Sequence, residues 1–230
     1  MPYLIFIFTF GLISFPSFAY ERDNLENENP SIMTDEYINS PDIERERYLN
    51  NLIQKGIQAH KRKDFNQAIS FYTQAIGREQ NSSDLFFNRG LAKSEGGYPE
   101  EAARDFTQAI KLNPDNDAAY FNRGIVESEM KAYGQALRDF DKTISLVPGD
   151  AKALYNRALT KYALNDIKGA LADAQKSRKF YTALRKRREV AEITSFINSI
   201  QNPEIQYQYE ERPPEMYYPQ PRRLFGPQNY

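Results

Sequence analysis

The sequence predicts an all-α fold, a solenoid of four helix-turn-helix repeats closed by a C-terminal capping helix. First, Phe-Asn-Arg-Gly at residues 87–90 returns at 121–124 and, as Tyr-Asn-Arg-Ala, at 155–158, each time 34 residues later. Second, apolar residues inside each copy recur at the spacing of an α-helix. Third, a Gly-Gly-Tyr-Pro break at 96–99 divides the copy around it into two helical runs. The chain is therefore predicted to be a string of helical hairpins.

A small residue and a ring keep the same period. Glycine inside a helix costs about 1 kcal/mol relative to alanine, so its recurrence predicts close approach by a second helix. An alanine lies 12 residues after each small residue. An aromatic residue lies 16 residues after it in every copy except the last. The small residues are Gly56, Gly90, Gly124 and Ala158; the alanines are Ala68, Ala102, Ala136 and Ala170; the ring position holds Tyr72, Phe106, Phe140 and Ala174.

This pattern, closed by Pro114 and Pro148 in two copies, resembles the tetratricopeptide repeat. The resemblance covers residues 49–184. It implies a right-handed α-solenoid whose first helices line a concave groove, and a scaffold that binds a peptide or a helix of another protein.

The ends of the solenoid are expected to differ from its middle, because each end has a face without a neighbour. Val190, Ile193 and Ile197 follow the last repeat at helical spacing and predict the cap. The repeats are expected at 49–82, 83–116, 117–150 and 151–184 and the cap at 185–200, within a solenoid of residues 40–200.

Residues 1–19 are predicted to be a signal peptide. The segment is apolar and uncharged, and it ends in Ser17-Phe18-Ala19, a pattern typical of cleavage after Ala19. The protein is therefore expected to be exported, as a periplasmic or secreted protein without stable membrane insertion once the signal is removed. The alternative is a membrane anchor formed by the uncleaved segment.

Two further segments are predicted to lie outside the solenoid. Residues 20–39 are acidic and contain few apolar side chains, which is typical of disorder. Residues 201–230 carry six prolines and five tyrosines. Such a tail favours extended, polyproline-like recognition over helix formation, so both termini are expected to be disordered.

A candidate peptide-binding groove follows from the resemblance, along the helix face that carries Phe87. One asparagine per repeat lies beside the apolar residues of this face, and its carboxamide offers both a donor and an acceptor to a peptide backbone. This row is similar to the asparagine ladder of O-linked N-acetylglucosamine transferases. The groove residues are Ile53, Ile57, Phe87, Asn88, Leu91, Phe121, Asn122, Ile125, Tyr155, Asn156, Leu159 and Tyr162.

Two alternatives remain open for this face: the asparagines are purely structural, or the protein itself covers part of the apolar stripe. Binding of chaperone C-terminal tails is excluded. The family's carboxylate clamp needs polar side chains at two positions that hold Phe87 and Leu91 here.

Composition excludes several other functions. Thirty Lys and Arg residues balance 31 Asp and Glu residues, so no overall field attracts nucleic acid. There is no cysteine and one histidine, which leaves little room for a zinc site or a Ser-His-Asp triad. We therefore expect no enzyme activity, no cofactor and no metal, and we expect His60, beside Lys61, to be a solvated surface residue.

A basic run begins the capping helix, at Arg185, Lys186, Arg187 and Arg188. It has three interpretations: a solvated helix face, a docking site for an acidic partner or an anionic surface, or a contact with the chain's own acidic residues 21–28.

The leading functional hypothesis is a non-enzymatic scaffold that binds an extended or helical segment of a partner protein in the groove. The partner's identity does not follow from the sequence. The alternative is a self-assembling structural protein whose C-terminal tail occupies its own groove or a neighbour's.

Overall fold

The computed structural model describes residues 40–202, and within this range it contains nine α-helices and no strand. The expected signal peptide and acidic segment, and the Pro/Tyr-rich tail from residue 203 onward, lie outside the described residues. The chain divides after Leu52 into two compact units. Each unit is described separately below.

The described part of the first unit is residues 40–52, the beginning of helix α3 (Pro41–Lys61). Ser40 precedes the helix, and its hydroxyl accepts a hydrogen bond from the backbone N–H of Ile43. Proline at the first helical position loses no hydrogen bond, because the first N–H groups of a helix have no partner within it. Leu49 is the first buried apolar side chain of this segment.

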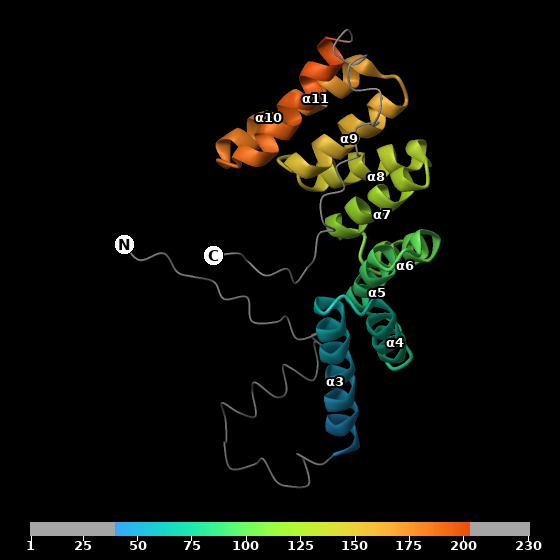
Figure 1. Cartoon of the computed structure of the whole chain (residues 1–230). Helices are drawn as coiled ribbons and strands as arrows, with labels where there is room; N and C mark the ends of the chain where they lie inside the picture. The colour runs from blue at the N-terminus through green and yellow to red at the C-terminus, as the bar shows by residue number, and fades with distance from the viewer. Residues whose placement is uncertain (1–39, 203–230) are drawn as a thin grey trace, which may run out of the picture. The chain divides into compact units, whose positions relative to one another are not determined.

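The second unit holds the end of α3 and eight further helices, in which each helix from α4 to α10 packs against the next (Figure 1). The helices alternate between first and second members of a hairpin. Their bounds are α4 Phe65–Ile76, α5 Ser83–Glu95, α6 Pro99–Leu112, α7 Asp117–Glu129, α8 Tyr133–Leu146, α9 Ala151–Ala163, α10 Ile167–Ala183 and α11 Arg187–Gln201.

The first helices of three hairpins start at polar caps that recur with the period of the repeat. The side chains of Ser82, Asn116 and Asp150 accept hydrogen bonds from backbone N–H groups in the first turns of α5, α7 and α9. Such caps satisfy donors that a helix end leaves without partners. The repeat therefore fixes where each first helix begins as well as which residues it buries.

The turn inside each hairpin also keeps the period. Lys63, Gly97, Lys131 and Asn165 all have φ between 61° and 85°, the left-handed region that reverses the chain at a helix end. Glycine occupies one of these four positions. The sequence pattern alone did not identify the other three, since lysine and asparagine are also common on helix surfaces.

Small residues meet rings where the period predicts close approach. A Cβ atom added to Gly90 would lie 2.8 Å from the ring of Phe106, and one added to Gly124 would lie 2.9 Å from the ring of Phe140. Gly56 stands in the same relation to Tyr72. The prediction of an all-α helical-repeat solenoid is confirmed.

Gly124→Ala is expected to lower the free energy of unfolding by up to about 2 kcal/mol. Overpacking against the buried ring of Phe140 destabilises by about 1–3 kcal/mol, and the helix propensity gained with alanine offsets about 1 kcal/mol of this. Urea unfolding followed by circular dichroism measures the change.

Gly134→Ala is the matched control, because nothing lies within 4 Å of a Cβ atom at this helical position. It is expected to stabilise the protein by up to about 1 kcal/mol. If both substitutions stabilised the chain equally, the close approach at Gly124 would not constrain the fold.

Candidate functional site

The first helices α5, α7 and α9 lie next to one another and form one row. A buried hydrogen bond of 3.0 Å joins the hydroxyl groups of Ser128 on α7 and Thr160 on α9. This is the row that the resemblance assigns to the binding groove, so the side chains on it decide what the face offers to a partner.

In the second and third repeats the predicted groove residues lie in the hydrophobic core. Phe87 and Leu91 belong to a buried cluster with Phe106 of α6 and alanines at the start of α7. Phe121 and Ile125 belong to a second cluster with Phe140 of α8 and Ala153 of α9. These four side chains fill the space between neighbouring helices.

In the fourth repeat the capping helix α11 covers the apolar residues. The ring of Phe196 stands edge-on to Tyr155 and to Tyr162, with centroids 5.7 Å and 5.6 Å apart. Tyr155 is buried, whereas Leu159 and Tyr162 stay partly exposed. In the first repeat Ile57 is buried and Ile53 is partly exposed.

The three asparagines occupy equivalent positions on α5, α7 and α9, and all three are buried. Their exposed fractions are 6% for Asn88, 2% for Asn122 and 7% for Asn156. The Nδ2 groups of Asn122 and Asn156 donate to backbone carbonyls four residues earlier, at 2.8 Å and 2.9 Å. One amide N–H of each is therefore used within its own helix.

Beside each asparagine, an arginine ties its helix to both neighbouring second helices. Arg89 donates two hydrogen bonds to the buried carboxylate of Asp105, 16 residues later, at 2.8 Å and 2.7 Å. Its remaining Nη1 group donates to the hydroxyl of Thr73, 16 residues earlier. Arg123 bridges Asp139 and Thr107 in the same way, and Arg157 bridges Asp173 and Asp141.

A second cation joins this network in two repeats. The ammonium group of Lys93 lies 2.8 Å from Asp105, and that of Lys161 lies 2.7 Å from Asp173. Burial acts to raise the pKa of Asp173, but hydrogen bonds from Arg157 and Lys161 outweigh it and hold that pKa below its usual value. Stability from this carboxylate is thus present above the usual aspartate pKa and is lost as the pH falls through the lowered value.

The third repeat breaks the pattern, because Glu127 occupies the position of Lys93 and Lys161. Its side chain is 12% exposed and lies 3.9 Å from Arg123. Burial, followed by repulsion from the carboxylate of Asp139, raises the pKa of Glu127 to about 7. This group therefore changes charge near neutral pH inside the repeat stack.

His60 is not a solvated surface residue, and that expectation was wrong. Its imidazole lies 3.2 Å from Glu95 at the end of α5, and its ring stands edge-on to Phe65. The residue is 7% exposed. The basic residues that follow it in sequence are exposed at the helix end, which is why the local composition misled.

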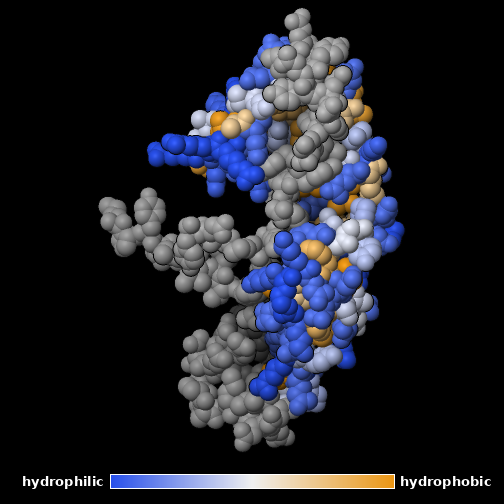
Figure 2. Space-filling view, viewed as in Figure 1, coloured by the Kyte–Doolittle hydropathy of each residue, from blue (hydrophilic) through white to orange (hydrophobic). Residues whose placement is uncertain are grey.

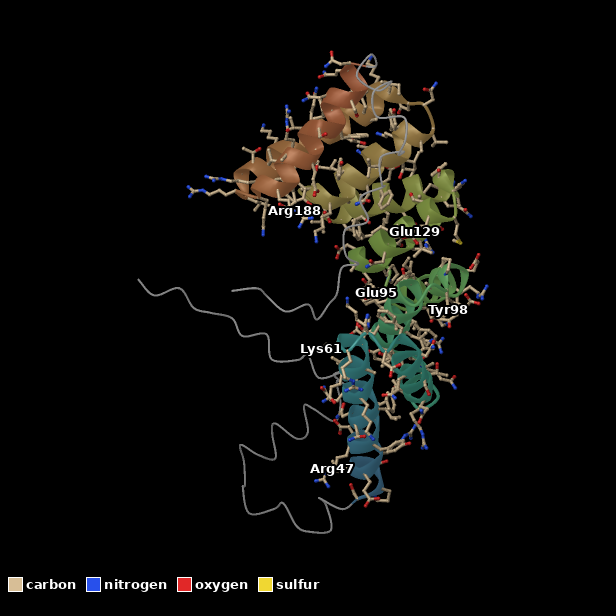
Figure 3. The ribbon with its side chains drawn as sticks, in the orientation of Figure 1. Arg47, Lys61, Glu95, Tyr98, Glu129 and Arg188 are labelled. Atoms are coloured by element: carbon tan, nitrogen blue, oxygen red, sulfur yellow. The ribbon has the colours of Figure 1, made fainter. Side chains whose placement is uncertain are left out.

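Among residues 40–202 no group of three or more His, Cys, Asp or Glu side chains is placed to hold a metal ion. None of the helices described there is long and apolar enough to cross a membrane. Arg185, Lys186, Arg187 and Arg188 are all exposed at the turn between α10 and α11, where Figure 3 labels Arg188.

The fold and this row of helices define a helical-repeat protein. Residues 87–127 match the family model described as tetratricopeptide repeat. No curated protein matches the chain.

Solved structures with the same fold include MamA (TM-score 0.56, 16% identity, 72% of this chain and 97% of that chain). A MamA RS-1 ArsTM double mutant is also similar, with a TM-score of 0.56 and 18% identity over 68% of this chain and 96% of that chain. The first TPR of Spaghetti (RPAP3) bound to the HSP90 peptide SRMEEVD is similar too, with a TM-score of 0.51 and 24% identity over 52% of this chain and 94% of that chain. At these identities the likeness shows the shared fold.

Proposed function

We propose that this protein is a non-enzymatic binding module that takes an extended or helical segment of a partner protein along the row of first helices. The observation that carries the proposal is the repetition of one carboxamide at the same place on three adjacent helices, Asn88, Asn122 and Asn156. The apolar export pattern of residues 1–19 supports a periplasmic or extracellular partner.

The geometry limits what the asparagines contribute. Adjacent helices pack about 8–10 Å apart, which is roughly the length of three extended residues. A partner backbone therefore meets one amide about every third residue and reaches only its uncovered edge. Each such hydrogen bond contributes on the order of 1 kcal/mol, so the row sets the register of the partner.

The apolar surface that a partner can contact lies at the α9 end of the row. Phe87, Leu91 and Phe121 are fully covered by neighbouring helices, whereas Leu159 and Tyr162 keep exposed surface. A partner thus gains apolar contact mainly over α9. The Spaghetti domain is bound to a peptide, which supports a peptide ligand for this fold, although Phe87 and Leu91 exclude a carboxylate clamp here.

Replacing Asn88, Asn122 and Asn156 together with alanine is expected to weaken partner binding at least about tenfold, since three hydrogen bonds of this strength are lost. The partner is first captured from the exported fraction with the wild-type chain. Its affinity for both chains is then measured by calorimetry.

The matched control replaces the exposed asparagines Asn66, Asn198 and Asn202 with alanine and should leave the affinity unchanged. Circular dichroism must show equal helicity in all three proteins. An unchanged affinity in the first variant would remove the asparagine row from the binding mechanism.

A further inference from the structure

Positive charge is concentrated where α10 turns into α11. Residues 176–188, here called the basic tip, contain seven Lys or Arg residues and no Asp or Glu. Figure 2 shows hydrophilic side chains projecting from the surface at the end of this hairpin, and Figure 3 places Arg188 there. The whole chain has a net charge of −1, so this charge is local.

The cations of the basic tip are not used to hold the fold together. Within residues 40–202 their one ion pair joins Arg188 and Glu192 at 3.3 Å, with Arg188 87% exposed. By contrast, Arg89, Arg123 and Arg157 are all bound to buried carboxylates. Cations this close together on the surface repel one another, so an anionic surface placed against them lowers their electrostatic energy.

An apolar side chain stands at the point of the turn. Leu184 is the C-cap residue that follows α10, and at 62% it is the most exposed large hydrophobic residue among those described. Arg185 follows in the left-handed conformation, with φ of 56°, and reverses the chain. Tyr181 is buried against α11 and anchors this end of α10. The hairpin therefore presents a leucine that is followed directly by four cations.

We propose that the basic tip is a docking surface for a membrane rich in anionic phospholipid. Basic residues near such a surface each strengthen binding about fivefold, and an exposed leucine enters the boundary between headgroups and acyl chains. Clusters of Arg also bind acidic peptides through charge, but the exposed leucine at the point of this projecting turn favours a membrane, because it has apolar lipid to enter there. Contact of this kind is peripheral and leaves the solenoid outside the bilayer.

The chain contains no tryptophan, so Leu184→Trp in the full chain is a single fluorescent reporter at the tip. Vesicles of phosphatidylglycerol and phosphatidylcholine in equal amounts are expected to shift its emission to the blue. Vesicles of phosphatidylcholine alone should not. The shift should weaken as salt is raised, because salt screens exposed charges.

Two variants that also carry Leu184→Trp test whether binding depends on the charges of the basic tip or on the net charge of the protein. Replacing Arg185, Lys186, Arg187 and Arg188 with glutamate should weaken vesicle binding at least about 100-fold. The matched control makes the same charge change at four exposed cations elsewhere and should bind within a few-fold of the reporter chain. Its positions are Arg62, Lys111, Lys131 and Arg138.

Three results would overturn the proposal. The first is no blue shift with anionic vesicles, and the second is an equal shift with neutral ones. The third is binding of a polyglutamate peptide that depends on the basic tip while the vesicles leave the emission unchanged, which would assign the tip to an acidic protein. Helicity measured on every variant verifies that each chain is folded.

Discussion

Replacing Asp105 with alanine is expected to lower the free energy of unfolding by about 3–5 kcal/mol. The buried carboxylate accepts two hydrogen bonds from Arg89 and lies 2.8 Å from the ammonium group of Lys93. Both cations are less than one-fifth exposed. Without the carboxylate they stay largely desolvated and repel each other, so the loss exceeds that of any one hydrogen bond. Urea unfolding at neutral pH measures it.

Two controls test whether charge is the cause. Glu100→Ala removes an exposed carboxylate from the same helix and should change stability by less than about 0.5 kcal/mol. Changing Arg89 and Lys93 to methionine and Asp105 to leucine should restore most of the lost stability, because a buried ion pair is often replaced by apolar groups without loss. A triple variant as unstable as Asp105→Ala would point to packing instead.

The parts of the fold that depend on spacing were predictable from the sequence. Gly90 and Phe106 lie 16 residues apart, and the same spacing recurs with Gly124 and Phe140. A glycine inside a helix is unfavourable unless a neighbouring helix packs closely against it, so the recurrence of glycine predicted where the helices of each hairpin meet. The structure places ring against glycine in both repeats.

Exposure of the candidate site was not predictable in the same way. A helical stripe that contains Phe121 and Ile125 shows which side chains share a face, but it does not show whether a neighbouring helix covers that face. Phe196 illustrates the difficulty, since it contacts Tyr155 and Tyr162 from a helix that begins after the last repeat. The twelve predicted groove residues remain a proposal, in which the buried apolar members act through packing and the three asparagines through their amide groups.

The Arg–Asp pairs between helices were not predicted, although the sequence contains a pattern that indicates them. Arg89 and Asp105 lie 16 residues apart, the same separation that joins each glycine to its ring, and Arg123 with Asp139 repeats it. Charged residues are common on solvated helix faces, so a single Arg or Asp does not indicate a buried pair. The signal is the recurrence of opposite charges 16 residues apart at the 34-residue period of the repeat.

Glu127→Lys is expected to raise the free energy of unfolding by about 3 kcal/mol above about pH 8. The rise in the pKa of Glu127 from its usual 4.5 to about 7 corresponds to about that energy. The folded state holds the proton more tightly than the unfolded state, so stability falls as the pH rises from about 4.5 to about 7. Lysine here would reach Asp139 as Lys93 reaches Asp105.

Glu127→Gln distinguishes the effect of losing the carboxylate from the effect of gaining a cation. It removes the ionisable group without adding a cation, so it should abolish the pH dependence between about 4.5 and 7 and recover most of the stability above about pH 8. Glu101→Gln, at an exposed carboxylate paired with Arg104, is the control and should keep the wild-type profile. Urea midpoints measured at closely spaced pH values give the comparison. If Glu127→Gln kept the wild-type pH dependence, the titrating group would lie elsewhere, and the break in the lysine pattern would have no energetic consequence.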